Sequence, residues 1–411
     1  MITDIPFCFK DKNEEYLTLG KLQEFCKING LKTDLDKVEL TASIVDFAKK
    51  SEENSSKVSI WMDETLKEGI KKLIICKINN IRQYWNKTAD EWEGIINNIF
   101  NINTSSHLLE FKHENKMKLC GYKLVSENGS VVKVEFLYSV LLKEYKNKNQ
   151  EPATIIYPIY VDLYLKEGYI VSRSKSKSAI YRFEKIKNGN TTIDEISNST
   201  NCDKLIDEAI NITIKAFEIE KEDMAVSMHR FKTIIHKIVD ETTHTPKEIK
   251  EKLDGEIGYI ERFAREFLTR QGISIVEGEN FTKAVEDLNI FMEKYISINY
   301  QDKQIFTNDR YGYPIKISVT DEDLSSIEET TLEDKPLQCT PIFFDNKKII
   351  QKQKKCDNLI MVFKRTPKTY FTNKTFQVIT EVKKGTMHID LRKYVLEEDI
   401  DNVLSRVIRS N

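Results

Sequence analysis

The chain has 411 residues, with 63 basic and 65 acidic side chains and a formal net charge of −2 at pH 7. Apolar residues at 40% and aromatic residues at 10% exclude a disordered chain, and the length indicates about two to three domains. Only 14 glycines are present, with neither a Walker A nor a GxGxxG motif, which argues against P-loop and Rossmann nucleotide sites.

The longest apolar runs, such as 155–165, are shorter than the ~18 residues that a membrane span needs. The first residues lack the basic and apolar parts of a secretory signal. The seven cysteines are scattered singly without a CxxC pair, so neither a disulfide framework nor a zinc site is expected. We therefore expect a cytoplasmic protein without a cofactor, a bound metal or membrane contact.

The first hundred residues show the apolar spacing of helices. The clearest periodicity lies at 61–78 and 81–100, and the polar run 51–57 is expected to be a linker. These segments predict a helical N-terminal region.

From residue 117 the sequence changes to branched and aromatic residues. Two strands, Met117–Val125 and Val131–Lys143, flank Asn128-Gly129, which is a strong hairpin signal. Two more follow at Thr154–Leu165 and Tyr169–Arg173. This order predicts an antiparallel meander.

Helical periodicity returns at 203–240. We expect the next helix to be capped by Thr245, with Glu248 completing a capping box, and to end at Gly272. A third helix follows Asn280. Three helices with short connections predict an antiparallel bundle.

Strands are expected again after 303, at Ile315–Val319, Ile342–Phe344, Leu359–Lys364, Thr369–Lys383 and Thr386–Leu391, before a short final helix. The fold class is therefore α+β, with an N-terminal helical region and an antiparallel β-sheet body that contains an inserted three-helix antiparallel bundle. The two β regions form either separate domains or one sheet, and one sheet is favoured because small sheets are marginal alone. The expected segments are 1–56, 57–104, 105–194, 195–300 and 301–411.

Residues 17–48 contain a compact pattern of helix signals. Thr18 precedes a helix that buries Leu22 and Phe25, Gly30 ends it, and Asp34 or Asp36 caps a second helix. The sequence LTLGKLQEFCKINGLKTDLDKVELTASIVDF resembles the SAP family of helix–extended-loop–helix modules.

The SAP resemblance implies DNA binding, with lysines near the second helix contacting phosphate. The residues that match this role are Lys32 and Lys37, assisted by Lys21 and Lys27. Asp34 and Asp36 stand where the family commonly has glycine and basic residues. Protein binding, as in the similar LEM modules, and a plain helical hairpin therefore remain open.

Two stretches concentrate basic residues. Residues 345–393 contain 13 basic and 4 acidic side chains, interleaved with Phe363, Tyr370, Phe371 and Phe376, and 166–187 contain 7 basic and 2 acidic ones. In the second stretch, the candidate nucleic-acid ligands are Arg173, Lys175, Lys177 and Arg182. The alternative is that these cations solvate exposed strands and block edge pairing.

Two patterns in the sequence could support catalysis or metal binding. Asp357, Glu381 and Lys383 have the order of a PD-(D/E)xK nuclease site, in which two carboxylates hold a metal ion and the lysine activates water. His229, His236 and Asp240 share one face of a predicted helix, and structural histidines are the favoured interpretation.

We expect a non-catalytic, cytosolic DNA-binding or DNA-associated protein that contacts the nucleic-acid backbone without sequence preference, of a kind found in antiviral-defence or mobile-element systems. A protein partner is a further expectation. One alternative is a metal-dependent nuclease. The other is a protein–protein adaptor that docks through the acidic segment 321–335 and the helices of 203–300.

Overall fold

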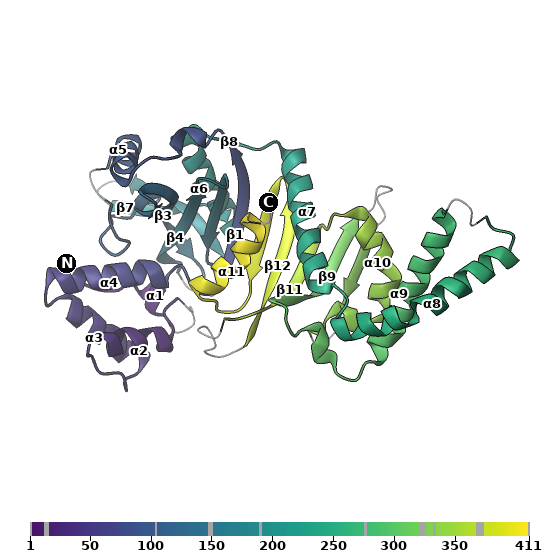
Figure 1. Ribbon diagram of the computed structural model, residues 1–411. Coiled ribbons are helices and arrows are strands. Elements are labelled where there is room, and N and C mark those ends of the chain that lie inside the picture. The colour runs from purple at the N-terminus through teal and green to yellow at the C-terminus, as the bar shows by residue number, and fades with distance from the viewer. Residues whose placement is uncertain are drawn as a thin grey trace. The chain divides into compact units, whose positions relative to one another are not determined.

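The computed structural model describes residues 2–11, 16–102, 105–146, 151–188, 191–274, 278–320, 326–331, 334–366 and 374–409. Within these ranges, eleven α-helices accompany antiparallel β-sheet (Figure 1), so the fold is α+β. No helix in these ranges has both the length and the apolar composition that crossing a membrane requires.

The chain forms two compact units. The first unit contains residues 1–227 and 383–411, and the second contains residues 228–382. The segment 301–411 that was expected from the sequence is therefore divided between the units. Two stretches far apart in the chain build the first unit, and no local sequence pattern encodes this return.

Four helices open the first unit: α1 (Phe7–Lys10), α2 (Leu19–Ile28), α3 (Lys37–Ala48) and α4 (Glu52–Thr65). Thr18, Asp36 and Ser51 each accept a hydrogen bond from the backbone N–H three residues further on, which caps α2, α3 and α4. The prediction of a linker at 51–57 is therefore wrong. Its polar residues form the exposed first turns of a helix that Ser51 begins.

The apolar run at the end of 61–78 is a strand, not the expected helix. Strand β1 (Lys71–Asn79) pairs with β5 (Tyr169–Ser174) on one side and with β13 (Thr386–Leu391) on the other. Residues 73–76 are all buried, and a continuously buried run has no period that separates strand from helix.

The helix expected over 81–100 begins later than predicted. A short 3-10 turn, η1 (Arg82–Tyr84), comes first, and α5 (Ala89–Phe100) starts where Thr88 and Glu91 form a capping box. The helical periodicity was therefore right for the second half of this segment.

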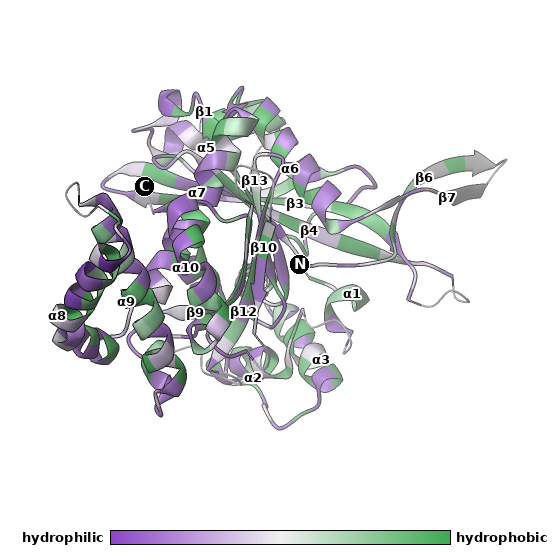
Figure 2. Cartoon of the chain, turned by 90° about the vertical axis from the view of Figure 1, so that its right-hand side faces the viewer, coloured by the Kyte–Doolittle hydropathy of each residue, from purple (hydrophilic) through white to green (hydrophobic). Residues whose placement is uncertain are grey.

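The sheet of the first unit has the strand order β13-β1-β5-β4-β3-β6-β7, with β2 on β3 and β8 on β1, and these pairs are antiparallel. The remaining strands are β2 (Lys118–Glu127), β3 (Ser130–Glu144), β4 (Ala153–Tyr164), β6 (Ile180–Asn188), β7 (Thr191–Thr200) and β8 (Glu220–Lys221). Asn128 and Gly129 have φ of 52° and 81°, which confirms the predicted hairpin. The β6–β7 hairpin was not expected, and Figure 2 shows it projecting as an arm from the rest of this sheet.

The helix expected over 203–240 is interrupted. Helix α6 (Cys202–Ala216) ends before Phe217, the chain turns at Glu218 with φ of 51°, and α7 (Met224–Thr243) begins after β8. Phe217 fits the helical period, but it is fully buried against Trp92 and Phe136 and anchors the turn in the core.

The second unit contains the sheet β10-β9-β11-β12, formed by β9 (Gly312–Thr320), β10 (Ser326–Thr330), β11 (Asn358–Lys364) and most of β12 (Thr375–Lys383). Most of α7, α8 (Lys247–Arg270), α9 (Glu279–Asn299), α10 (Pro341–Gln353) and the 3-10 turns η2 (Lys303–Phe306) and η3 (Leu337–Cys339) complete it. Helices α8 and α9 lie side by side as a hairpin (Figure 1). Ile342–Phe344, expected as a strand, lies in α10, because Pro341 starts a helix whose inner face holds Phe343 and Phe344.

Helix α8 begins without the expected cap. Pro246 occupies the N-cap position, and the Thr245 hydroxyl donates instead to Glu293 Oε1 at 2.7 Å. The buried carboxylate of Glu293 also accepts from Lys347 Nζ at 2.5 Å, so it is satisfied by two donors. Gly272 follows the end of α8 with φ of 65°, as expected.

Candidate nucleic-acid interface

The N-terminal helix pair is defined here as α2, α3 and the segment 29–36 between them. Gly30 has φ of 68° and follows the end of α2, and Leu31 packs against the buried core. Asp36 and Glu39 form a capping box at the start of α3. The local geometry expected for 17–48, two capped helices joined by a non-helical segment, is therefore confirmed.

Two of the four lysines predicted to contact phosphate already bind other groups of this chain. Lys21 Nζ lies 2.8 Å from a carboxylate oxygen of Glu68 and is only partly exposed. Lys37 Nζ donates to the backbone carbonyl of Asp11 at 3.1 Å. Moving either ammonium group to a phosphate means breaking these contacts, so Lys21 and Lys37 contribute less than the sequence implied.

Lys27 and Lys32 are exposed. Lys27 lies in the last turn of α2, where a cation also interacts favourably with the helix dipole. The Asp36 carboxylate accepts from the backbone N–H of Glu39 at 2.8 Å, so its charge is partly compensated by the start of α3. Asp34 is exposed two residues from Lys32 and reduces the positive potential there.

Arg173 and Lys177 are buried rather than available to a phosphate. Arg173 is 1% exposed, and its guanidinium donates to both carboxylate oxygens of Glu397 at 2.6 Å. Lys177 Nζ lies 2.6 Å from Glu144, and its side chain is 4% exposed. Neither side chain is placed to contact a phosphate. Arg173 lies in β5, which runs between β1 and β4 with both faces covered, and Lys177 lies beyond the end of β5 and pairs with Glu144.

Lys175 and Arg182 are partly exposed, but both have contacts within the chain. Lys175 Nζ lies 4.4 Å from the centre of the Tyr16 ring, and the Arg182 guanidinium pairs with Glu208 on α6. The stretch 166–187 therefore has fewer available cations than its composition predicts.

Arg173 belongs to a buried charge cluster whose members are Lys67, Lys133, Glu135, Asp162, Arg173 and Glu397. Both lysines lie within 2.6 Å of Glu135, and Arg173 lies 3.5 Å from Asp162. Lys67, Glu135, Asp162 and Arg173 are thus buried next to opposite charges, while Lys133 and Glu397 stay partly exposed at the edge of the cluster. The sequence signal for the cluster was Asp162 inside the apolar run 155–165, which periodicity alone did not explain.

Burial and neighbouring charges shift the pKa values in this region. Although burial opposes it, the two lysines lower the pKa of Glu135 to about 2. Burial raises the pKa of Asp162 to about 6 despite the nearby Arg173. Burial, with Arg173 and Lys175 nearby, lowers the pKa of Lys71 to about 7. Because Glu397 begins α11 (Glu397–Ile408), the cluster ties that helix to the sheet.

The basic stretch 345–393 forms no stacking platform in its described part. Phe363 and Phe376 are buried and stack on each other with ring centres 5.9 Å apart, so they belong to the core. Lys347 and Lys348 form ion pairs with residues of α9. Lys368, Tyr370 and Phe371 lie outside the described residues, as do parts of the acidic segment 321–335.

Asp357 does not lie on the strand face that carries Glu381 and Lys383 of the proposed nuclease site. Asp357 accepts from Lys232 Nζ at 2.5 Å, and the next residue, Asn358, pairs across the sheet with Glu381. Because side chains alternate along a strand, Asp357 and Glu381 point to opposite faces. Lys383 is exposed and belongs to the first unit. Among the residues that the structure describes, no three His, Cys, Asp or Glu side chains gather to hold a metal ion.

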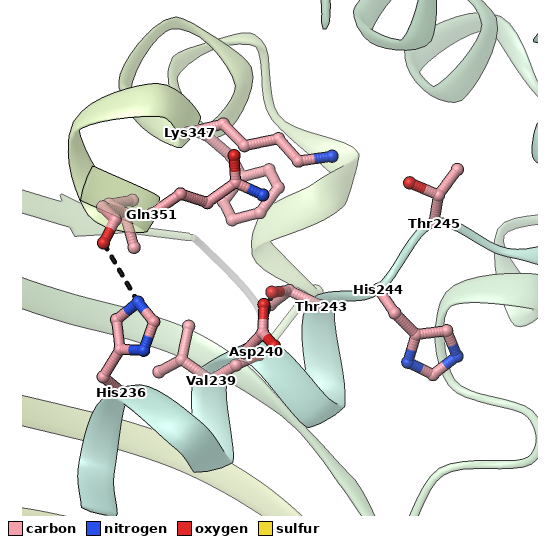
Figure 3. Close-up of a pocket in the computed structure, with 10 residues that line it drawn as sticks. His236, Val239, Asp240, Thr243, His244, Thr245, Lys347 and Gln351 are labelled. Carbon is pink, nitrogen blue, oxygen red and sulfur yellow. Dashed lines mark hydrogen bonds between the residues drawn. The ribbon is translucent and has the colours of Figure 1, made fainter. Parts of the chain in front are cut away.

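A cavity of about 240 Å³, lined by both polar and apolar side chains, lies in the second unit (Figure 3). His236 and Asp240, one turn apart on α7, line it with Gln351 and Lys347 of α10. The hydrogen bond between His236 Nε2 and the Ile350 carbonyl is 3.1 Å long, and burial lowers the pKa of His236, so the ring is neutral at pH 7. The cavity lining contains both an acidic group, Asp240, and a basic group, Lys347, so it does not select a ligand of one charge.

No protein-family model matches the chain, and no curated protein is significantly similar to it. A functional assignment therefore depends on the residues themselves.

Proposed function

We propose that this protein is a non-catalytic DNA-binding protein whose N-terminal helix pair contacts the phosphate backbone without sequence preference. The observation that carries the proposal is the exposure of Lys27 and Lys32 on that helix pair. The resemblance of residues 17–48 to SAP modules also supports DNA binding.

The small number of available cations sets the expected strength of binding. Two phosphate contacts predict a slope of about −1.8 for the logarithm of affinity against the logarithm of salt concentration, because each contact releases counterions. Asp34 opposes the approach of phosphate, so specificity and tight binding are not expected from this surface alone. The helix pair is expected to bind weakly and to position the rest of the protein on DNA.

The test is fluorescence anisotropy of a labelled duplex titrated with the full chain at several salt concentrations. Lys27→Glu/Lys32→Glu should abolish the salt-dependent binding. The matched control is Lys352→Glu/Lys355→Glu, which makes the same charge change at exposed lysines of the second unit and should leave binding unchanged. Absence of binding by the unmodified chain, or an equal loss in both variants, would overturn the proposal.

A second candidate function is a protein–protein adaptor, and one observation favours it. Ile28 and Val38 on the same helix pair are 77% and 76% exposed, which suits an apolar partner surface better than phosphate. Ile28→Ser/Val38→Ser should leave DNA affinity unchanged if phosphate is the ligand. A stoichiometric protein recovered after nuclease treatment and lost in this variant would favour the adaptor.

A further inference from the structure

Helix α8 has a second apolar face in addition to the one that it buries. Ile260, Ala264 and Leu268 are buried, as expected for a helix that packs against α9. Tyr259, Phe263 and Phe267 follow the same spacing one position earlier, and they are 65%, 57% and 50% exposed. In Figure 2, α8 accordingly alternates between hydrophilic and hydrophobic segments.

These three aromatic side chains form a continuous stripe. Phe263 and Phe267 stack with ring centres 6.2 Å apart, and the Arg262 guanidinium lies 4.9 Å from the Tyr259 ring. Single exposed aromatic residues are normal, but a contiguous row marks an interaction surface. A partner that covers the stripe is therefore expected, and the charges around it indicate which one.

The stripe is flanked by opposite charges at equal distances from its centre. Glu256 lies seven residues before Phe263, and Arg270 lies seven residues after it. Seven residues are close to two helical turns, so both side chains lie on the face of Phe263. Both are exposed. The contact known for Arg270 within the helix is a surface pair with Glu266 at 3.6 Å, which rearranges easily.

We propose that α8 pairs antiparallel with α8 of a second copy of this chain, around a two-fold axis at Phe263. In this arrangement Tyr259 faces Phe267 of the second copy, and the two Phe263 side chains meet at the axis. Glu256 faces Arg270 of the second copy, and the reverse contact forms at the other end. A two-fold interface requires such self-complementarity, and α8 provides it in both apolar and charged residues.

The charge pattern excludes a parallel pairing of the same faces. Parallel helices would place Glu256 against Glu256 and Arg270 against Arg270, which is repulsive at both ends. Residues 256–270 contain three acidic and three basic side chains, so the surface around the stripe lacks the net positive charge that a nucleic-acid ligand requires. A second copy is the occupant that satisfies both ends.

The size of the stripe predicts a weak dimer. The three aromatic side chains of each copy make six in the dimer, and each is at least half exposed. At about 200 Å² for a whole aromatic side chain, together they offer about 600 Å² of exposed surface. Specific interfaces usually bury about 1,200 Å² or more, so the flanking residues must contribute the remainder. We expect a concentration-dependent dimer in the micromolar range.

Sedimentation equilibrium of the full chain tests this pairing. Glu256→Arg alone places arginines opposite each other, and Arg270→Glu alone places glutamates opposite each other, so each variant should be monomeric. An equimolar mixture of the two variants should form a heterodimer, because each charge again meets its opposite. The double variant Glu256→Arg/Arg270→Glu should recover the association of the unmodified chain.

Three results would overturn the proposal: an unmodified chain that stays monomeric at high concentration, single variants that still associate, or a mixture that fails to associate. Both substitutions lie on exposed positions, and unchanged thermal unfolding of the monomeric variants verifies that they fold. Lys27→Glu/Lys32→Glu should dimerise normally, so failure of DNA binding and failure of dimerisation remain distinguishable.

Discussion

The two units differ in which side chains they bury: the first buries charged groups, and the second exposes aromatic ones. In the first unit, Arg173 and Asp162 are buried inside a sheet, while in the second unit Tyr259 and Phe263 are more than half exposed on α8. Arg173 is buried because Glu397 matches its charge at 2.6 Å. A side chain's exposure therefore depends on the partner that the fold provides, and residue type alone predicts it poorly.

The largest expected effect comes from removing the charge partner in the first unit. Arg173→Ala leaves Asp162 and Glu397 without their shared guanidinium, and it should lower the free energy of unfolding by about 3–5 kcal/mol in urea denaturation at pH 7. The neighbouring, partly exposed Lys175→Ala is the control, with an expected loss of about 1 kcal/mol or less. Equal losses in the two variants would contradict the importance of the buried pair.

A pH-dependent effect of intermediate size is expected from Lys71. Its pKa is lowered to about 7, so between pH 7 and 9 the unfolded chain holds a proton that the folded chain has released. The free energy of unfolding therefore rises with pH, by up to about 1.4 kcal/mol per unit. Lys71→Met should remove this rise and stabilise the protein most at pH 6–7, as measured by urea midpoints at each pH.

The adjacent Lys72 provides the control for this pH experiment. Its ammonium pairs with Asp203 at 2.7 Å, and its pKa is raised, even though burial opposes this. Lys72→Met should therefore keep the slope between pH 7 and 9. Parallel profiles for the unmodified chain and Lys71→Met would show that Lys71 does not titrate in this range.

The smallest effect is expected on the exposed stripe. Phe263→Ala should change the free energy of unfolding by less than about 0.5 kcal/mol at a concentration where the chain is monomeric, because the side chain has little cover. Phe363 in β11 is 3% exposed, and Phe363→Ala should cost about 3–5 kcal/mol. A large loss for Phe263→Ala would mean that the stripe packs within its own chain.

Sequence patterns predicted the elements whose signals are local. The Asn128-Gly129 hairpin, the cap at Asp36 and the helix end at Gly272 all depend on one or two residues with special backbone or capping properties. The continuously buried residues 73–76 carried no such signal, because a strand covered on both faces shows no alternation. No local sequence pattern indicates that the chain returns to the first unit at residue 383.

The candidate site was predictable only in part. Lys27 in the last turn of α2 and Lys32 in the segment between α2 and α3 are both exposed, as the sequence predicted. The alternating serines and cations of 172–178 resemble a solvated edge strand, but β5, which contains Arg173, lies between two neighbours, and Lys177 pairs with Glu144 beyond its end. The partners Glu397 and Glu144 come from distant strands and helices, and composition does not reveal such pairings.

Residues 383–411 supply β13 and α11 to a unit whose other residues end at 227. During translation, the strand that covers one edge of β1 leaves the ribosome only after the whole inserted unit has been synthesised. Until then β1 presents unpaired backbone groups, which are a template for aggregation. A nascent chain that stalls before this point would therefore depend on chaperones, even though most of its residues have already been made.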